Sequence, residues 1–67
     1  MTQFDFTADY NTGACQQYMF YSKAEALVHA KRYGLSIGAE SMSFTVHHGK
    51  SRGTTYYHRK GNRWYLY

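Results

Sequence analysis

The C-terminal third of the sequence combines aromatic and basic side chains in a pattern that suits binding. Tyrosine and histidine rings can stack on nucleic-acid bases, while lysine and arginine can neutralise phosphates. The same residue types dominate the energetic centres of protein interfaces. The candidate partner-binding residues are His47, Lys50, Arg52, Tyr56, His58, Lys60, Arg63, Tyr65 and Tyr67. A purely structural alternative is that tyrosine is a favourable strand residue whose ring tolerates water.

A hairpin would place most of these residues on one face. Gly61-Asn62 fits a two-residue turn. Glycine at the first central position suits a type II′ turn, and asparagine tolerates the left-handed conformation that a type I′ turn requires. With that turn, Lys60 lies opposite Arg63, His58 opposite Tyr65, and Tyr56 opposite Tyr67. The other face would carry Tyr57, Arg59, Trp64 and Leu66, of which Trp64 and Leu66 are the expected core residues. His47 would lie on the first face if its strand pairs with residues 54–60 in a register that keeps the side chains of both strands on the same face. The segment between these two strands, Gly49–Gly53, is expected to be a basic loop.

The sequence gives only weak signals for metal binding, catalysis or nucleotide hydrolysis. His47, His48, His58 and Cys15 lack the spacing of a metal site, and adjacent strand residues point to opposite faces. Cys15 has no identifiable base, and Asp5 and Asp9 are not arranged as an acid–base pair. The segment 49–53 does not have the spacing of a phosphate-binding Walker loop. We therefore expect no enzymatic activity, no metal and no cofactor.

Length and charge narrow the class of partner. Sixty-seven residues allow one domain, 1–67, whose small core leaves marginal stability that a partner or a homodimer can supplement. The formal net charge is +4, and residues 41–67 carry five Lys and Arg but no acid. This favours an anionic partner, although a moderate charge also simply keeps a small protein soluble.

The sequence also indicates a compartment. A single cysteine, Cys15, cannot form the intramolecular disulfides on which small secreted domains usually depend. No run approaches the roughly 18 apolar residues of a membrane span, and the N-terminus has acids where a signal peptide has basic residues. We therefore expect a cytoplasmic protein without a membrane partner.

The first half of the chain predicts a hairpin followed by a helix. Apolar residues alternate with polar ones over 4–10, as in a strand with one buried face. Asn11-Thr12-Gly13 is turn chemistry, and 15–21 is the return strand, whose buried side the pattern leaves open. Ser22 and Glu25 form a capping box. The helix is expected to end at Gly34, with Lys31 and Arg32 in its last turn. One face of the helix would carry the apolar residues Ala24, Leu27, Val28 and Ala30. Another face would carry the polar residues Glu25, His29 and Arg32.

The second half predicts three more strands. Residues 35–40 are expected to be a connection, and Met42, Phe44 and Val46 alternate with polar residues as a third strand. Segments 54–60 and 63–67 are the fourth and fifth. The fold class is therefore α+β, in the order ββαβββ, with one helix packed on one face of an antiparallel five-stranded sheet.

The run 22–34, followed by a strand, a basic hairpin and Tyr57-His58-Arg59-Lys60-Gly61-Asn62-Arg63-Trp64, resembles small phage anti-CRISPR proteins that inhibit type I surveillance complexes. The resemblance covers the C-terminal two thirds of the chain. It implies a non-enzymatic inhibitor that sits on the backbone subunits of an RNA-guided complex in the host bacterial cytoplasm and competes electrostatically with target DNA.

Two functional hypotheses follow. The first is an inhibitor that binds a bacterial protein or ribonucleoprotein, such as a CRISPR surveillance complex, through the basic tyrosine-rich face. The second is a DNA- or RNA-binding accessory domain that uses the same face. The target and the oligomeric state cannot be derived from the sequence.

Overall fold

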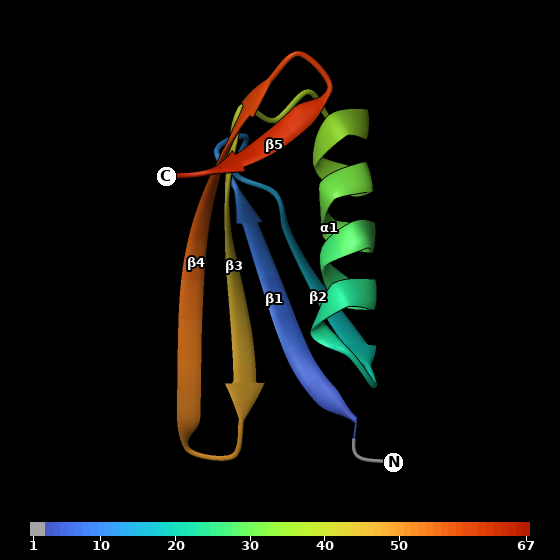
Figure 1. Ribbon diagram of the computed structural model, residues 1–67, viewed down its shortest axis with the longest axis vertical. Helices are drawn as coiled ribbons and strands as arrows, with labels where there is room; N and C mark the ends of the chain where they lie inside the picture. The colour runs from blue at the N-terminus through green and yellow to red at the C-terminus, as the bar shows by residue number, and fades with distance from the viewer. Residues whose placement is uncertain (1–2) are drawn as a thin grey trace.

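The computed structural model describes residues 3–67, which form a five-stranded antiparallel sheet with one helix on one of its faces (Figure 1). The order along the chain is ββαβββ, so the predicted α+β class is confirmed. The elements are β1 (Phe4–Tyr10), β2 (Cys15–Phe20), α1 (Lys23–Ser36), β3 (Ser41–His48), β4 (Ser51–Lys60) and β5 (Arg63–Leu66). The strands lie side by side in the order β2-β1-β3-β4-β5.

The core lies between α1 and the central strands β1 and β3. Phe6, Ala8 and Tyr10 of β1 are buried, and Phe6 stacks on Phe44 of β3 with ring centroids 5.6 Å apart. Phe44 lies opposite Ala8 in the β1–β3 register, so the apolar sides of both strands face the helix. The alternation predicted for 4–10 and 42–46 is confirmed.

Strand β2 is an edge strand, and its pairing settles the side that its sequence left open. Tyr18 lies opposite Phe6, and Phe20 lies opposite Phe4, so both face the helix and are partly buried. Cys15 and Met19 point to the other face, where Met19 is 57% exposed.

The helix begins as predicted. Ser22 is the N-cap, and its hydroxyl accepts a hydrogen bond from the Glu25 backbone N–H at 3.2 Å. That bond satisfies one of the backbone donors that a helix start leaves without an intrahelical partner.

The predicted end of the helix at Gly34 is wrong. The helix continues to Ser36 and ends in a Schellman motif, in which the Ala39 N–H donates to the Gly34 carbonyl at 2.9 Å and the Gly38 N–H to the Leu35 carbonyl at 3.2 Å. Gly38 has φ +71°, the left-handed conformation that this motif requires. The stop signal is therefore Gly38, and the expectation that Lys31 and Arg32 lie in the last turn is also wrong, because both residues lie too early in the helix.

The buried side of α1 is made of very small residues. Ala26, Ala30 and Gly34 follow one another at four-residue spacing and are buried. Ala24 and Val28, predicted to share a face with Ala30, are exposed, Val28 at 49%. Leu27 packs against the edge of the core, as predicted. Small side chains let the helix backbone approach the aromatic rings of the sheet closely.

Two aromatic side chains attach the sheet to this small-residue side. The Tyr10 hydroxyl donates to the Ala30 carbonyl at 2.6 Å, and the Trp64 indole N–H donates to the Lys31 carbonyl at 3.2 Å. Burial raises the pKa of Tyr10 well above its ordinary value, so its hydroxyl stays protonated and can donate. Beside these bonds, a Cβ added at Gly34 would lie 2.6 Å from Trp64 Cζ2 and 2.9 Å from Tyr10 Cε1.

The β4–β5 hairpin has the predicted register, but its core side differs in part. Trp64 packs against the core, as predicted, whereas the prediction that Leu66 is a core residue is wrong, because Leu66 is 64% exposed. Tyr57, on the same face, is buried instead. The reason is that α1 packs over β2, β1 and β3, so on the far edge strand only the long indole reaches the helix. Arg59, on the same side, donates from Nε to the Ala39 carbonyl and from Nη1 to the Gly61 carbonyl, each at 2.6 Å.

Both C-terminal hairpins close with a two-residue Gly-X turn. Gly49 and Gly61 each have φ +62°, and no non-glycine residue that the structure describes has a positive φ, so each turn has the type II′ pattern. The expected five-residue loop Gly49–Gly53 is therefore wrong, because Gly49-Lys50 alone is the turn and β4 already begins at Ser51.

Gly34→Ala tests the close contact between the helix and Trp64. In an exposed helix this change stabilises by about 1 kcal/mol, but here the new methyl group must displace two rings. We expect the free energy of unfolding to fall by about 1–3 kcal/mol in urea denaturation. Val28→Ala, at an exposed position of the same helix, should change it by less than about 0.5 kcal/mol. A Gly34→Ala protein more stable than the wild type would contradict the contact.

Candidate binding surface

The β4–β5 hairpin presents six candidate residues on the sheet face opposite the helix. Lys60 lies opposite Arg63 and His58 opposite Tyr65, and the Tyr67 N–H donates to the Tyr56 carbonyl at 3.1 Å. The sequence-derived register is therefore confirmed. We call this set the hairpin patch; it comprises Tyr56, His58, Lys60, Arg63, Tyr65 and Tyr67.

The rings of the hairpin patch are close together and exposed. The His58 ring lies 5.9 Å from that of Tyr65 and 4.8 Å from that of Tyr67, measured between centroids. Tyr56, Tyr65 and Tyr67 are 60%, 45% and 79% exposed. Such rings can stack on a base or pack against an apolar side chain, while Lys60 and Arg63 beside them can meet an anion.

The remaining three candidates form a separate group at the other end of β4. His47 lies opposite Arg52 on the same open face, and Lys50 lies in the adjoining turn. The His47 ring nitrogen Nε2 is 3.0 Å from the Thr7 hydroxyl, which orients the ring. Eight residues of strand, about 26 Å, separate Arg52 from Lys60, so one small ligand cannot touch both groups.

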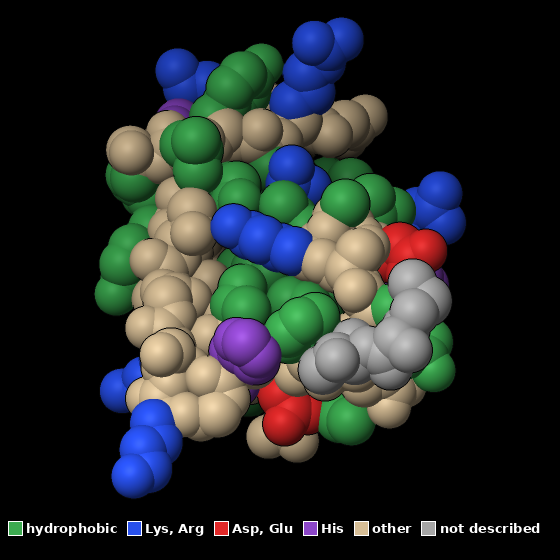
Figure 2. All heavy atoms as spheres, turned by 60° about the horizontal axis from the view of Figure 1, so that its bottom comes forward, with side chains coloured by type: hydrophobic (Ala, Val, Ile, Leu, Met, Phe, Trp, Pro, Cys, Tyr) green, Lys and Arg blue, Asp and Glu red, His purple; other side chains and the backbone are tan. Residues whose placement is uncertain are grey.

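Neutral side chains fill the space between the two groups. Thr45 and Thr54 lie opposite each other, with hydroxyl oxygens 2.9 Å apart. Figure 2 shows Lys and Arg side chains near both ends of the left edge of the view, with mostly neutral side chains between them. The candidate set therefore shares one face but not one site.

The open face also carries the two acidic residues of β1. Asp5 lies opposite His47, and Asp9 opposite Ser43, so both carboxylates point to the same face as the hairpin patch. Strands β1 and β4 flank β3 and are therefore about 10 Å apart. The face is acidic along β1 and basic along β4 and β5. Only the non-local pairing of β1 with β3 reveals this, because no local sequence signal encodes it.

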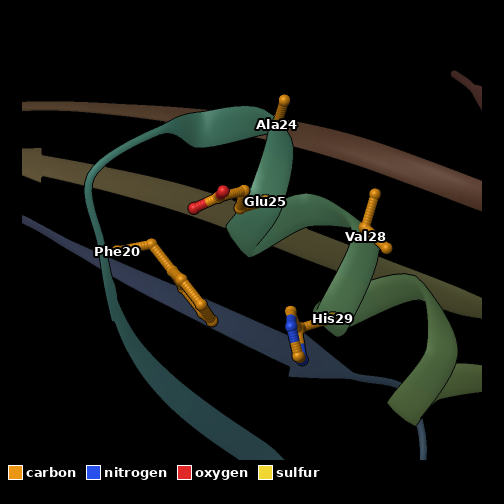
Figure 3. Close-up of a pocket in the computed structure, with 5 residues that line it drawn as sticks. All are labelled: Phe20, Ala24, Glu25, Val28 and His29. Carbon is orange, nitrogen blue, oxygen red and sulfur yellow. The ribbon is translucent and has the colours of Figure 1, made fainter.

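A shallow hollow lies on the opposite side of the sheet, between the end of β2 and the start of α1 (Figure 3). It measures about 400 Å³ and is lined by Phe20, Ala24, Glu25, Val28 and His29. The His29 ring stacks on Phe20 at 4.9 Å between centroids. His29 thus joins the helix to β2, in addition to lying one turn from Glu25.

Cys15 is exposed but is placed unfavourably for nucleophilic chemistry. Asp9 lies opposite Cys15 in the β1–β2 register, and a hydrogen bond from the thiol to this carboxylate raises the pKa of Cys15, as do burial and the negative charge of Asp9. A raised pKa leaves less thiolate, the reactive form, at neutral pH.

The histidines of the described residues do not belong to a cluster of metal-ligand side chains. His47 contacts Thr7 on the open face, whereas His48 packs against the Phe4 ring at 4.9 Å on the helix side. Residues 3–67 contain no group of three or more His, Cys, Asp or Glu side chains that could hold a metal ion. Within the same range, α1 is too short and too polar to cross a membrane.

No family model, curated protein or solved structure matches this chain. The open face must therefore be interpreted from its own chemistry.

Alkylation of Cys15 tests the contact with Asp9. We expect the rate of reaction with iodoacetamide to rise with pH around a midpoint above that of a free cysteine, because the thiol pKa is raised. Asp9→Asn should move the midpoint to lower pH, since it removes the negative charge. Asp5→Asn, the same change four residues away on the same face, should leave the profile unchanged. Equal shifts in both variants would contradict the assignment.

Proposed function

We propose that the protein is a non-enzymatic binding protein that blocks a protein or ribonucleoprotein partner through its open sheet face. The observation that carries the proposal is the composition of the hairpin patch, where three exposed tyrosines, a histidine and two cations share one face. The core of the fold uses the opposite side of the same hairpin, through Tyr57 and Trp64. The patch residues are thus available to a partner.

The pairing of Lys60 with Arg63 supports an anionic contact. Like charges directly opposite each other on neighbouring strands repel and slightly destabilise a hairpin. Folding gains nothing from this pair, whereas an acidic group placed between the two cations would relieve the repulsion. Both residues are exposed and flank the Gly61-Asn62 turn, so such a group can reach them.

The carboxylates of β1 favour a protein-containing partner over a bare nucleic acid. A polyanionic backbone that crosses the strands would meet Asp5 about 10 Å from Arg52, and Asp9 about 10 Å from Tyr56. A protein surface can present acids to the hairpin patch and bases to β1 at the same time, and such complementarity gives specificity. A bacterial defence ribonucleoprotein in the host cytoplasm, which the anti-CRISPR resemblance implies, is a partner of this kind.

Direct binding of single-stranded DNA or RNA is the second candidate function. It is favoured by the clustered rings of His58, Tyr65 and Tyr67, on which successive bases could stack. A strand that runs along the β4–β5 hairpin would avoid the acids of β1. Its affinity would fall steeply with salt, because each neutralised phosphate releases counterions.

Charge reversal at the turn tests the proposed function. The partner is recovered by pull-down from bacterial lysate with and without nuclease, and is then titrated by calorimetry. Lys60→Glu combined with Arg63→Glu should lower the affinity by about 100-fold or more, since an anionic partner loses two attractions and meets two repulsions. The reversed pair still repels across the strands, so the free energy of unfolding should change by less than about 1 kcal/mol.

Lys23→Glu combined with Arg32→Glu provides the matched control. Both residues are exposed on α1, away from the open face, and the change in net charge is the same. This control should bind like the wild type. Equal losses of affinity in the two double variants would show that the effect depends on net charge alone. Unchanged affinity in a folded Lys60→Glu, Arg63→Glu protein would contradict the role of the hairpin patch.

A further inference from the structure

Strand β4 has an outer edge that β5 covers only in part. Tyr57–Lys60 pair with β5, and Tyr56 accepts the bond from Tyr67. Among residues 3–67, no strand lies outside Ser51–Thr55. Figure 1 shows β5 beside the upper part of β4 alone, while the lower part forms the edge of the sheet.

The direction of the backbone groups along this edge follows from two observed bonds. The Arg59 N–H donates to Glu40 at the start of β3, whereas the Tyr56 carbonyl accepts from Tyr67 on the outer side. Because consecutive residues of a strand direct their N–H and C=O groups to opposite sides, the even-numbered residues of β4 face outward. Arg52 and Thr54 therefore direct their backbone donors and acceptors away from β3.

The edge has few of the features that usually protect an exposed strand. Natural edges are blunted by proline, by charged side chains, especially lysine, by bulges or by very short strands. The sequence from Ser51 to Thr55 contains neither proline nor lysine, carries one charge at Arg52 and ends in two threonines, which favour strands. Its five residues continue the regular ladder with β3.

We propose that this edge pairs with the same edge of a second copy of the chain. The two β4 strands would run antiparallel about a two-fold axis at Gly53, joining two sheets into one. Arg52 would then lie opposite Thr54 of the second copy, and the outward groups of the two pairs would form four backbone hydrogen bonds. Such a self-complementary contact is the usual interface of a homodimer.

The register is decided by elimination. A two-fold axis midway between two residues would place each residue whose backbone N–H and C=O face outward opposite a residue whose backbone groups face inward. Such residues cannot form hydrogen bonds with each other. An axis at Arg52 would place two guanidinium groups directly opposite each other, which is unfavourable. An axis at Thr54 or Thr55 would require the edge of Tyr56, which Tyr67 occupies. An axis at Ser51 would place Lys50 opposite Arg52, which again sets like charges against each other. Gly53 is the axis that remains.

The dimer would be weak and would respond to salt in the opposite sense from partner binding. Five paired residues bury less area than the standard interface of about 1,600 Å² in total. Two copies with a formal charge of +4 each repel, and salt screens that repulsion. Dimerisation should therefore strengthen with salt, whereas binding of an anionic partner should weaken, so the two proposals fail independently.

Disulfide trapping tests the axis. Directly opposite residues of a non-hydrogen-bonded pair have Cα atoms about 4.5 Å apart, within the range that a disulfide spans. A Cβ at Gly53 would meet no atom within 4 Å, so cysteine fits there. In a Cys15→Ser background, Gly53→Cys should form a covalent dimer in a glutathione redox buffer. Ser51→Cys, exposed on the same face but opposite Thr55 of the second copy, should remain monomeric.

Sedimentation equilibrium supplies a second readout without any engineered cysteine. The weight-average mass of the wild type should rise toward that of a dimer as concentration increases, and further in 0.5 M NaCl. Thr54→Pro removes an outward N–H and should remain monomeric, while Thr54→Val, which loses the same hydroxyl contact with Thr45, should still dimerise. A wild type that stays monomeric at millimolar concentration, or equal trapping at positions 51 and 53, would overturn the proposal.

Discussion

The close approach of Trp64 to the helix at Gly34 determines how the β4–β5 hairpin is oriented on the sheet. The indole packs where a Cβ would otherwise be, and its N–H binds the Lys31 carbonyl. Because successive strand residues point to opposite faces, this contact directs Arg63 and Tyr65 away from the helix. The two-residue Gly61-Asn62 turn places Lys60 opposite Arg63, so the side chains of β4 that lie opposite Arg63 and Tyr65 point to the same face as these residues. The orientation of the hairpin patch is therefore a consequence of how the partly buried Trp64 ring packs.

The open face exists because a chain of this size supplies one helix to cover a five-stranded sheet. The helix lies over β2, β1 and β3, which buries the apolar side of the central strands and leaves the opposite side to solvent. On that side, carboxylates lie along β1 and cations along β4 and β5, with hydroxyl groups on β3 between them. Such a polarised surface is suited to complement the charges of another macromolecule.

Features with a local physical cause were predictable from the sequence. Alternation over β1 and β3, the Ser22 cap and the register of the Gly61-Asn62 hairpin each depend on a few neighbouring residues. Features that depend on packing were not. Gly34 resembled a helix stop, but it is a glycine because an indole packs against it, and the actual stop is Gly38. The candidate residues were located on the correct face, yet their separation into two groups depends on the length of β4, which the short Gly49-Lys50 turn extends.

The orientation of the β4–β5 hairpin is the central claim, since the position of the binding surface depends on it. The most direct test is nuclear Overhauser spectroscopy of the isotope-labelled protein, which reports proton pairs closer than about 5 Å. The account predicts strong cross-peaks between the Trp64 indole protons and the α-protons of Gly34, because the backbone and the ring are in van der Waals contact. It also predicts cross-peaks between the rings of His58 and Tyr67. Cross-peaks from the Tyr65 ring to the helix, with none from Trp64, would show that the hairpin presents its other face and would contradict the account.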